Sequence, residues 1–136
     1  MNTQTFDHDI TVVYVTAASF PDGIAQAHQQ LHSLVPFSTQ RRYFGLSRPE
    51  NGKGIVYRAA AEKLASAGAP EPGLPVLVLP KGTYYSLTLQ DYMKDLAGID
   101  RAFKTLLAQP GIDPDGYCVE WYPNNKDIIC MVRKAD

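Results

Sequence analysis

The sequence predicts an α+β fold in which two helices pack on an antiparallel sheet. Three observations predict it. Runs of β-branched and aromatic residues between turn formers are typical of short strands. Two segments place apolar residues every three or four positions, as amphipathic helices do. The order strand, helix, strand, strand occurs twice, and such repeats build one sheet covered by helices. The 136 residues, 45% of them hydrophobic, are enough for one domain spanning residues 1–136.

The first copy of this order covers about residues 9–61. It opens on residues 10–16, whose β-branched side chains predict a strand. Ser19 or a neighbour is expected to cap a helix that holds Pro21 in its first turn. The apolar spacing after it predicts that this helix ends near Pro36.

A hairpin is predicted next, from residues 41–46 and 54–60. The segment between them contains proline, asparagine and glycine, which favour a turn. Residues 62–75 are rich in alanine, glycine and proline and predict a connector.

The second copy covers about residues 76–133. It predicts a strand at 82–88, a helix at 91–108 and a hairpin formed by 117–122 and 127–132. The predicted apolar stripe of the helix consists of Tyr92, Leu96, Ile99, Phe103 and Leu106. Two such repeats are expected to form a pseudo-symmetric domain with both helices on one face and a ligand cleft at the seam.

Composition limits the classes of partner and compartment. A net charge of -1 and a pI near 6.3 do not provide the basic surface that nucleic acids require. Neither a signal peptide nor a membrane span is visible, so a cytoplasmic protein is expected. Cys118 and Cys130 lie on the two arms of the second hairpin without metal-ligand spacing, and they are expected to be reduced.

Glu120 is the residue on which the functional prediction rests. Strand side chains alternate between faces, so Cys118, Glu120 and Tyr122 share one side of their strand. A buried carboxylate is costly without a cation, and aromatic faces attract the same cation. This pattern suits a flat, apolar, cationic ligand, and the alternative is an edge-strand carboxylate in water.

The chain resembles the GyrI-like small-molecule-binding domains, also called bacterial transcription activator effector-binding domains. The resemblance rests on the duplicated order, on residues 116–122 following a helix that ends in Leu106 and Leu107, and on residues 79–85 before the second repeat. The resemblance implies that Glu120 reaches a central cleft that binds lipophilic, aromatic or cationic compounds, as in multidrug sensors. In some members this domain follows a DNA-binding helix-turn-helix and regulates transcription. With a strand beginning at Ile10, a stand-alone binder is expected here.

The expected site combines the acid with aromatic walls from both repeats. Only one of the neighbours Tyr43 and Phe44 can face the cleft, and Tyr84 and Tyr85 likewise point to opposite sides. The candidate ligand-binding residues are Glu120, Tyr122, Tyr43, Phe44, Tyr57, Tyr85 and Tyr92. No cofactor or metal is expected, although His28 and His32 have the four-residue spacing of a metal-binding pair. A solvated pair, or a pair at the rim of the cleft, is favoured over a metal site, and a hydrogen bond of His28 inside the fold is a further alternative.

Two alternatives remain open at this stage. In the first, the chain is a hydrolase of small electrophiles in which Glu120 serves as general base, without any nucleophilic dyad in the sequence. In the second, it modulates a protein partner, as gyrase-inhibitory relatives of the resembled family do. Turnover distinguishes the first from simple binding, and partner binding that survives Glu120→Gln distinguishes the second.

Overall fold

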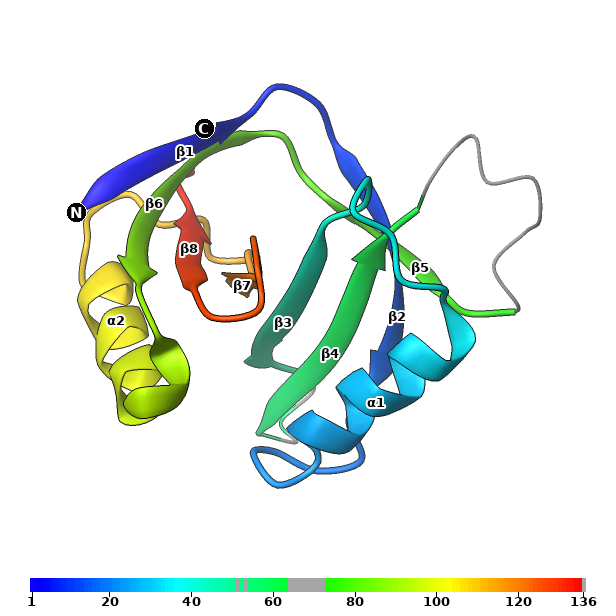
Figure 1. The fold of residues 1–136 in the computed structure, drawn as a ribbon. Coiled ribbons are helices and arrows are strands. Elements are labelled where there is room, and N and C mark those ends of the chain that lie inside the picture. The colour runs from blue at the N-terminus through cyan, green and yellow to red at the C-terminus, as the bar shows by residue number, and fades with distance from the viewer. Residues whose placement is uncertain (51, 53, 64–72, 136) are drawn as a thin grey trace.

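A computed structural model describes residues 1–50, 52, 54–63 and 73–135 of the chain (Figure 1). Its elements follow one another in the order β1 (Asn2–Phe6), β2 (Ile10–Thr16), α1 (Ile24–Leu34), β3 (Tyr43–Pro49), β4 (Ile55–Glu62), β5 (Val76–Leu79), β6 (Gly82–Leu89), the 3-10 helix η1 (Tyr92–Lys94), α2 (Ala97–Leu107), β7 (Cys118–Trp121) and β8 (Ile128–Arg133).

All these strands join one sheet in the order β1-β6-β8-β7-β3-β4-β2-β5. Every pairing in it is antiparallel. The predicted α+β class, with an antiparallel sheet and two α-helices, is therefore confirmed. The two predicted hairpins are also confirmed, as β3 with β4 and β7 with β8.

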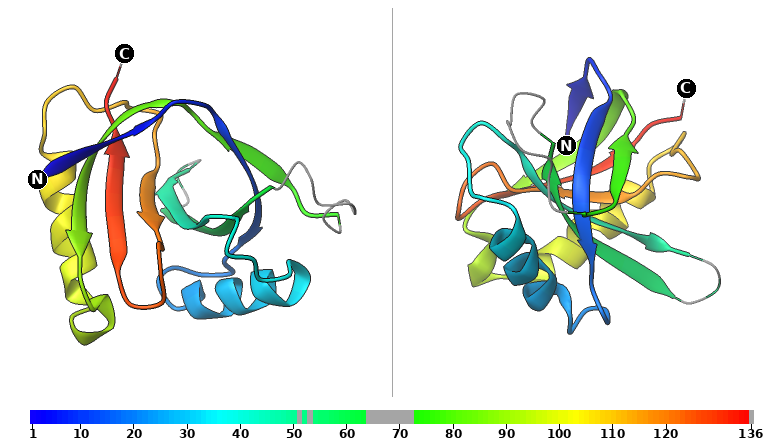
Figure 2. Two further views of the ribbon diagram at one scale, coloured as in Figure 1. Left: turned by 45° about the horizontal axis from the view of Figure 1, so that its top comes forward. Right: turned by 90° about the vertical axis from the view of Figure 1, so that its right-hand side faces the viewer.

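The sheet curls, and two long segments, residues 2–16 and residues 76–89, cross it together from one edge to the other. β1 pairs with β6 from Asn2 opposite Ser86 to Phe6 opposite Gly82, and β2 pairs with β5 beyond the crossing. At the bend the Lys81 N–H donates to Asp9 Oδ1 over 2.8 Å. Gly82 has φ 135°, which favours glycine because it lacks a Cβ. These two segments run across the top of the molecule in Figure 1 and in the left view of Figure 2.

Both α-helices cover the same face of the sheet. Residues directly opposite in antiparallel strands share a face, and Ala59, Gly45, Glu120 and Cys130 form such a row across β4, β3, β7 and β8. Ala59 packs in the cluster that contains α1, and Cys130 packs in the cluster that contains α2. Glu120 therefore lies on the helix-covered face, between the two clusters.

The opposite face carries the other core cluster. Its side chains come from strands at both ends of the sheet, which the curl brings together. The buried members of this cluster are Phe6, Ile10, Val12, Phe44, Leu46, Ala60, Leu79, Tyr84, Val119 and Met131. Burying these apolar side chains is the main favourable term that holds the curl closed.

The first helix begins later than predicted. Its N-cap is Gly23, and no side chain caps it, so the expected capping by Ser19 is wrong. The chain turns first: the Gly23 N–H donates to the Ser19 carbonyl over 3.1 Å, and the Ile24 N–H to the Pro21 carbonyl over 3.2 Å. Pro21 therefore belongs to this turn and not to the helix.

The predicted helix 91–108 is divided. Tyr92 lies in η1, and the backbone at Asp95 leaves the helical region at φ -152° before α2 begins. Leu96 is consequently 56% exposed, which removes it from the predicted apolar stripe. Ile99, Phe103 and Leu106 do pack in the cluster beneath α2.

Two strands were not predicted at all. β1 has the polar sequence NTQTF and forms because β6 supplies its partner, and β5 forms beside β2 in the same way. Tertiary pairing overrides local preference at β1, whereas the sequence VLVL of β5 itself favours a strand. Most of the predicted connector 62–75 falls on residues 64–72, which lie outside the described residues. Among the described helices, none has the length and apolarity needed to cross a membrane.

Candidate functional site

Glu120 lies near the middle of the sheet because β7 pairs with β3 on one side and with β8 on the other. The alternation of β7 directs Val119 and Trp121 towards the core on the opposite face. Glu120 and Tyr122 then point to the helix-covered face, as the sequence pattern predicts. Only 9% of Glu120 is exposed, so this carboxyl is among the few buried charged or polar groups in the described chain.

Gly45 leaves the room that this carboxyl requires. It lies directly opposite Glu120 in the pairing of β3 with β7. A Cβ at this position would stand 2.0 Å from the Tyr57 hydroxyl and 2.7 Å from Glu120 Oε1. The missing side chain lets Tyr57, from β4, reach across β3 to the acid on β7.

Two tyrosine hydroxyls converge on one oxygen of Glu120. Tyr57 donates to Oε1 over 3.0 Å, and Tyr122 donates to the same atom. The Nε2 atom of His28, on α1, lies 2.8 Å from the Tyr57 oxygen. Because the Tyr57 hydrogen is directed at Glu120, the His28 nitrogen takes the donor role. The result is a chain of hydrogen bonds from α1 through β4 to the centre of the sheet.

Aromatic rings surround this chain. His28 stands edge-on to Tyr122, with ring centroids 5.5 Å apart. The Tyr92 ring lies 5.9 Å from the Tyr122 ring, and Phe20 stacks on Tyr57 at 6.2 Å with 26° between the planes. The faces of such rings attract organic cations, whereas their edges carry partial positive charge.

Burial favours the neutral form of each titratable member of the group. Desolvation raises the pKa of Glu120, although hydrogen bonds from Tyr122 and Tyr57 partly oppose the rise. Burial, with a smaller repulsion from His32, lowers the pKa of His28 to about 4. Desolvation and the nearby Glu120 raise the pKa values of both tyrosines. The same two causes raise the pKa of the free thiol Cys118 to about 11.

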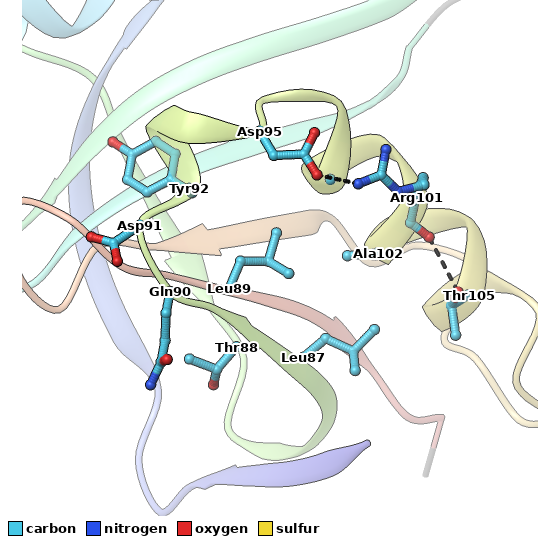
Figure 3. Close-up of a pocket in the computed structure, with 11 residues that line it drawn as sticks. Leu87, Thr88, Leu89, Gln90, Asp91, Tyr92, Asp95, Arg101, Ala102 and Thr105 are labelled. Atoms are coloured by element: carbon cyan, nitrogen blue, oxygen red, sulfur yellow. Dashed lines mark hydrogen bonds and ion pairs between the residues drawn. The ribbon is translucent and has the colours of Figure 1, made fainter.

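Two pockets flank the group without reaching the carboxyl itself. One, of about 520 Å³, is lined by Thr16, Ala17, Ala18, Ser19, Phe20, Gly54, Ile55, Val56 and Tyr57. The other, of about 480 Å³, lies between the end of β6 and α2, with Tyr92 at one end and an Asp95–Arg101 ion pair along α2 (Figure 3). Tyr57 therefore separates the first pocket from Glu120, while Tyr92 and Tyr122 stand between Glu120 and the second.

The predicted site residues divide into those that bond or adjoin Glu120, one that shares its face but is bonded elsewhere, and two that lie apart from it. Tyr57 and Tyr122 bond Glu120, and Tyr92 adjoins them. Tyr43 shares their face, but its hydroxyl accepts from the Ser38 N–H and its ring stacks on Phe37, 5.7 Å away.

Two candidates lie apart from Glu120. Phe44 is fully buried in the cluster on the opposite face, so of the pair Tyr43 and Phe44 only Tyr43 shares the face of Glu120. Tyr85 is on the helix-covered face, but its hydroxyl donates to the carbonyl of Pro110, which follows the C-terminal end of α2. Tyr84 faces the opposite cluster, so the alternation of these neighbours is confirmed.

Sequence reasoning missed two contributors, Gly45 and Phe20, and did not identify the hydrogen-bond partner of His28. The hydrogen bond considered for His28 exists, but its partner Tyr57 lies 29 residues away. Gly45 gave no signal, because its role depends on two side chains from other strands. Phe20 stands in a turn that was predicted to be helix. As for the metal pair, no cluster of three His, Cys, Asp or Glu side chains suited to a metal occurs within the described ranges.

The chain shares its fold with an integron cassette protein. That protein is VCH_CASS2, from the mobile metagenome of Vibrio cholerae, and the TM-score is 0.67 at 13% sequence identity. The alignment covers 98% of this chain and 94% of the cassette protein. No family model matches the sequence, and no curated protein matches it. At this identity the similarity concerns the fold alone.

Proposed function

We propose that the protein binds small aromatic cations at Glu120, as a GyrI-like effector-binding domain. The observation that carries the proposal is a buried carboxyl whose hydrogen-bond donors are both tyrosines. In the described residues, no Lys or Arg is paired with it. An ionised carboxylate buried without a counter-ion costs several kcal/mol, which a bound organic cation offsets. The ring faces of Tyr57, Tyr122 and Phe20 add attraction for the same cation.

The order of strands supports the two-repeat architecture that this proposal includes. We propose residues 9–61 and 76–133 as repeats. When β2, β3 and β4 are exchanged with β6, β7 and β8, and β1 with β5, the order of strands stays the same if the sheet is read from its opposite edge. In this arrangement β3 and β7 meet at the pseudo-symmetry axis, and Glu120 with Gly45 lies on the seam between the repeats.

The pocket beside Phe20 is the proposed seat of the aromatic part of the ligand. Tyr57 is the side chain that this pocket shares with the hydrogen-bond chain. Rotation of the Tyr57 ring away from Glu120 would connect the pocket with the carboxyl. The ligand cation would then replace the Tyr57 hydroxyl as a partner of Glu120.

A thermal-shift comparison tests this function. Three probes separate charge from shape: phenyltrimethylammonium carries both, tert-butylbenzene only the ring shape, and tetramethylammonium only the charge. Phenyltrimethylammonium at 100 times its Kd should add about 2.7 kcal/mol of stability. The neutral analogue should add little, and Glu120→Gln should lose the response.

Asp100→Asn is the matched control, since it removes an exposed carboxylate on α2 that pairs with Lys104. It should respond as wild type does. A response of Glu120→Gln equal to that of wild type would exclude Glu120 as the binding group. If none of the three probes shifts the melting temperature of wild type, the cation-binding function is wrong.

General-base catalysis by the same carboxyl is the second candidate. The observation that favours it is the raised pKa of Glu120, because a base with a pKa near the working pH transfers protons efficiently. Incubation with small electrophiles such as epoxides, followed by mass spectrometry, tests it. Products that Glu120→Gln fails to form would indicate an enzyme, and a bound but unchanged compound would indicate a binding protein.

A further inference from the structure

Among the described residues, the titratable groups near Glu120 come from the elements packed around it. Tyr57 approaches from β4, Cys118 from β7, Tyr122 from the position that directly follows β7, and Cys130 from β8. His28 approaches from α1, with His32 one turn further along, and Tyr92 approaches from η1. On β3 the residue opposite is Gly45, which cannot be charged. None of these groups is a Lys or Arg.

His28 is the basic side chain that joins the hydrogen-bond chain of Glu120, and its surroundings favour its neutral form. Its Nε2 atom contacts the Tyr57 oxygen and not the carboxylate, so a charged imidazolium would gain no direct ion pair with Glu120. Burial lowers its pKa to about 4, well below neutrality. His28 therefore serves as a hydrogen-bond donor and supplies no counter-charge to the acid.

The two tyrosines compensate a negative charge on Glu120 only in part. Both of their hydrogen bonds fall on the same oxygen of Glu120. They lower its pKa by less than desolvation raises it. Cys118 and Cys130, whose thiols stay protonated at neutral pH, contribute no charge.

We propose that a cation binds at Glu120 in exchange for a proton. In the free protein the carboxyl is neutral, and the arriving cation replaces the carboxyl proton, which is released to solvent. One positive charge enters as one leaves, so the buried site keeps the same net charge. This inference rests on the proposed function and adds to it a rule of selectivity: raising the pH strengthens the binding of cations and leaves that of neutral analogues unchanged.

The size of the pH effect follows from the exchange. Below the pKa of Glu120 each pH unit changes the affinity for a cation by up to tenfold, and above it the affinity is constant. Phenyltrimethylammonium is the probe, because its own charge does not depend on pH. We expect a Kd that falls with rising pH between pH 5 and 8, and a release approaching one proton per ligand at the acidic end.

Isothermal titration calorimetry in two buffers of different ionisation enthalpy counts the released protons. His32→Gln is the matched control on α1, and it should keep the pH dependence. Binding with no proton release, or with a Kd that is constant from pH 5 to 8, would overturn the exchange while leaving the binding function in place. Loss of the pH dependence in His32→Gln would also overturn it, by assigning the titration to that histidine.

A measurement without ligand separates the two proposals. The sequence contains four glutamates, so the carboxyl carbon of Glu120 is readily followed by NMR in protein labelled with 13C-glutamate. Its resonance is assigned by its loss in Glu120→Gln, or by its displacement in Tyr57→Phe should the first variant not fold. We expect a protonated carboxyl at pH 7. An ionised carboxyl would overturn the exchange, whereas a protonated one with no cation binding at any pH would overturn the proposed function and the exchange with it.

Discussion

Replacement of Gly45 by alanine should break the hydrogen-bond chain at its most crowded point. The added Cβ would stand 2.0 Å from the Tyr57 hydroxyl and 2.7 Å from Glu120 Oε1, distances that real Cβ atoms do not adopt. Backbone pairing fixes Gly45 on both sides, opposite Ala59 and Glu120. The Tyr57 ring must therefore move, and its 3.0 Å bond to Glu120 is lost.

The magnitude has two parts. Loss of a hydrogen bond to a buried acid costs about 1–3 kcal/mol, and overpacking a rigid interior costs about 1–3 kcal/mol more. We expect a total near 3 kcal/mol. An entropy of unfolding of about 2.1 cal/mol/K per residue converts this into a fall in Tm of about 10 °C for a chain of 136 residues.

Urea unfolding followed by the fluorescence of Trp121, the single tryptophan, measures this loss. Gly98→Ala is the control, because its Cβ would meet nothing nearer than 3.4 Å, and on α2 it should add about 0.5–1 kcal/mol. Tyr57→Phe combined with Gly45→Ala should recover part of the loss, since it removes the atom at 2.0 Å. Wild-type stability of Gly45→Ala, or strict additivity in the double variant, would refute the reasoning.

Two further predictions concern proton binding and thiol reactivity. His28 has its pKa lowered from 6.5 to about 4, so the folded protein binds fewer protons than the unfolded chain between these values and loses stability as the pH falls. The stability of His28→Gln relative to wild type should therefore rise by about 2 kcal/mol from pH 7 to pH 5 in urea unfolding, and a constant difference would contradict the buried, neutral imidazole. Burial and Glu120 raise the pKa of Cys118 from 9.0 to about 11 and that of Cys130 to about 12. Both thiols should react with a disulfide reagent at least about 100-fold more slowly in the folded protein than in urea, and fast reaction of either would show that its surroundings are more open than described.

The sequence pattern predicted the parts of the fold that local chemistry determines. Runs such as Ile10–Thr16 are strands on their β-branched composition alone, and β2 has these bounds. Asn2–Phe6 could not be found in this way, because its polar side chains form a strand only beside β6. The break at Asp95 in the predicted second helix could not be found either, because the spacing of apolar residues carries no information about it.

In the site, too, the sequence predicted what local alternation determines and not what strand pairing determines. Alternation within β7 was enough to place Glu120 and Tyr122 on one face. The contact of Glu120 with Tyr57 spans 63 residues, and it depends on the register of β3 between their strands. His28 joins the hydrogen-bond chain from α1, a helix that begins later than the sequence predicted. Distances of this kind come from strand pairing, which a single sequence specifies only through the complete fold.

The crossing of the two long segments has a consequence for how the molecule comes apart. β1 lies in the first half of the chain but pairs with β6 in the second half, while β5 begins the second half and pairs with β2 in the first. Each half of the chain thus supplies an outer strand to the other, and the halves are interlocked. Neither half retains a complete sheet if the other unfolds, so we infer that opening is all-or-none and not stepwise. Stabilisation gained at Glu120 would then be transmitted to amides as distant as those of Asn2–Phe6, whose hydrogen exchange would slow together with that of the sheet centre.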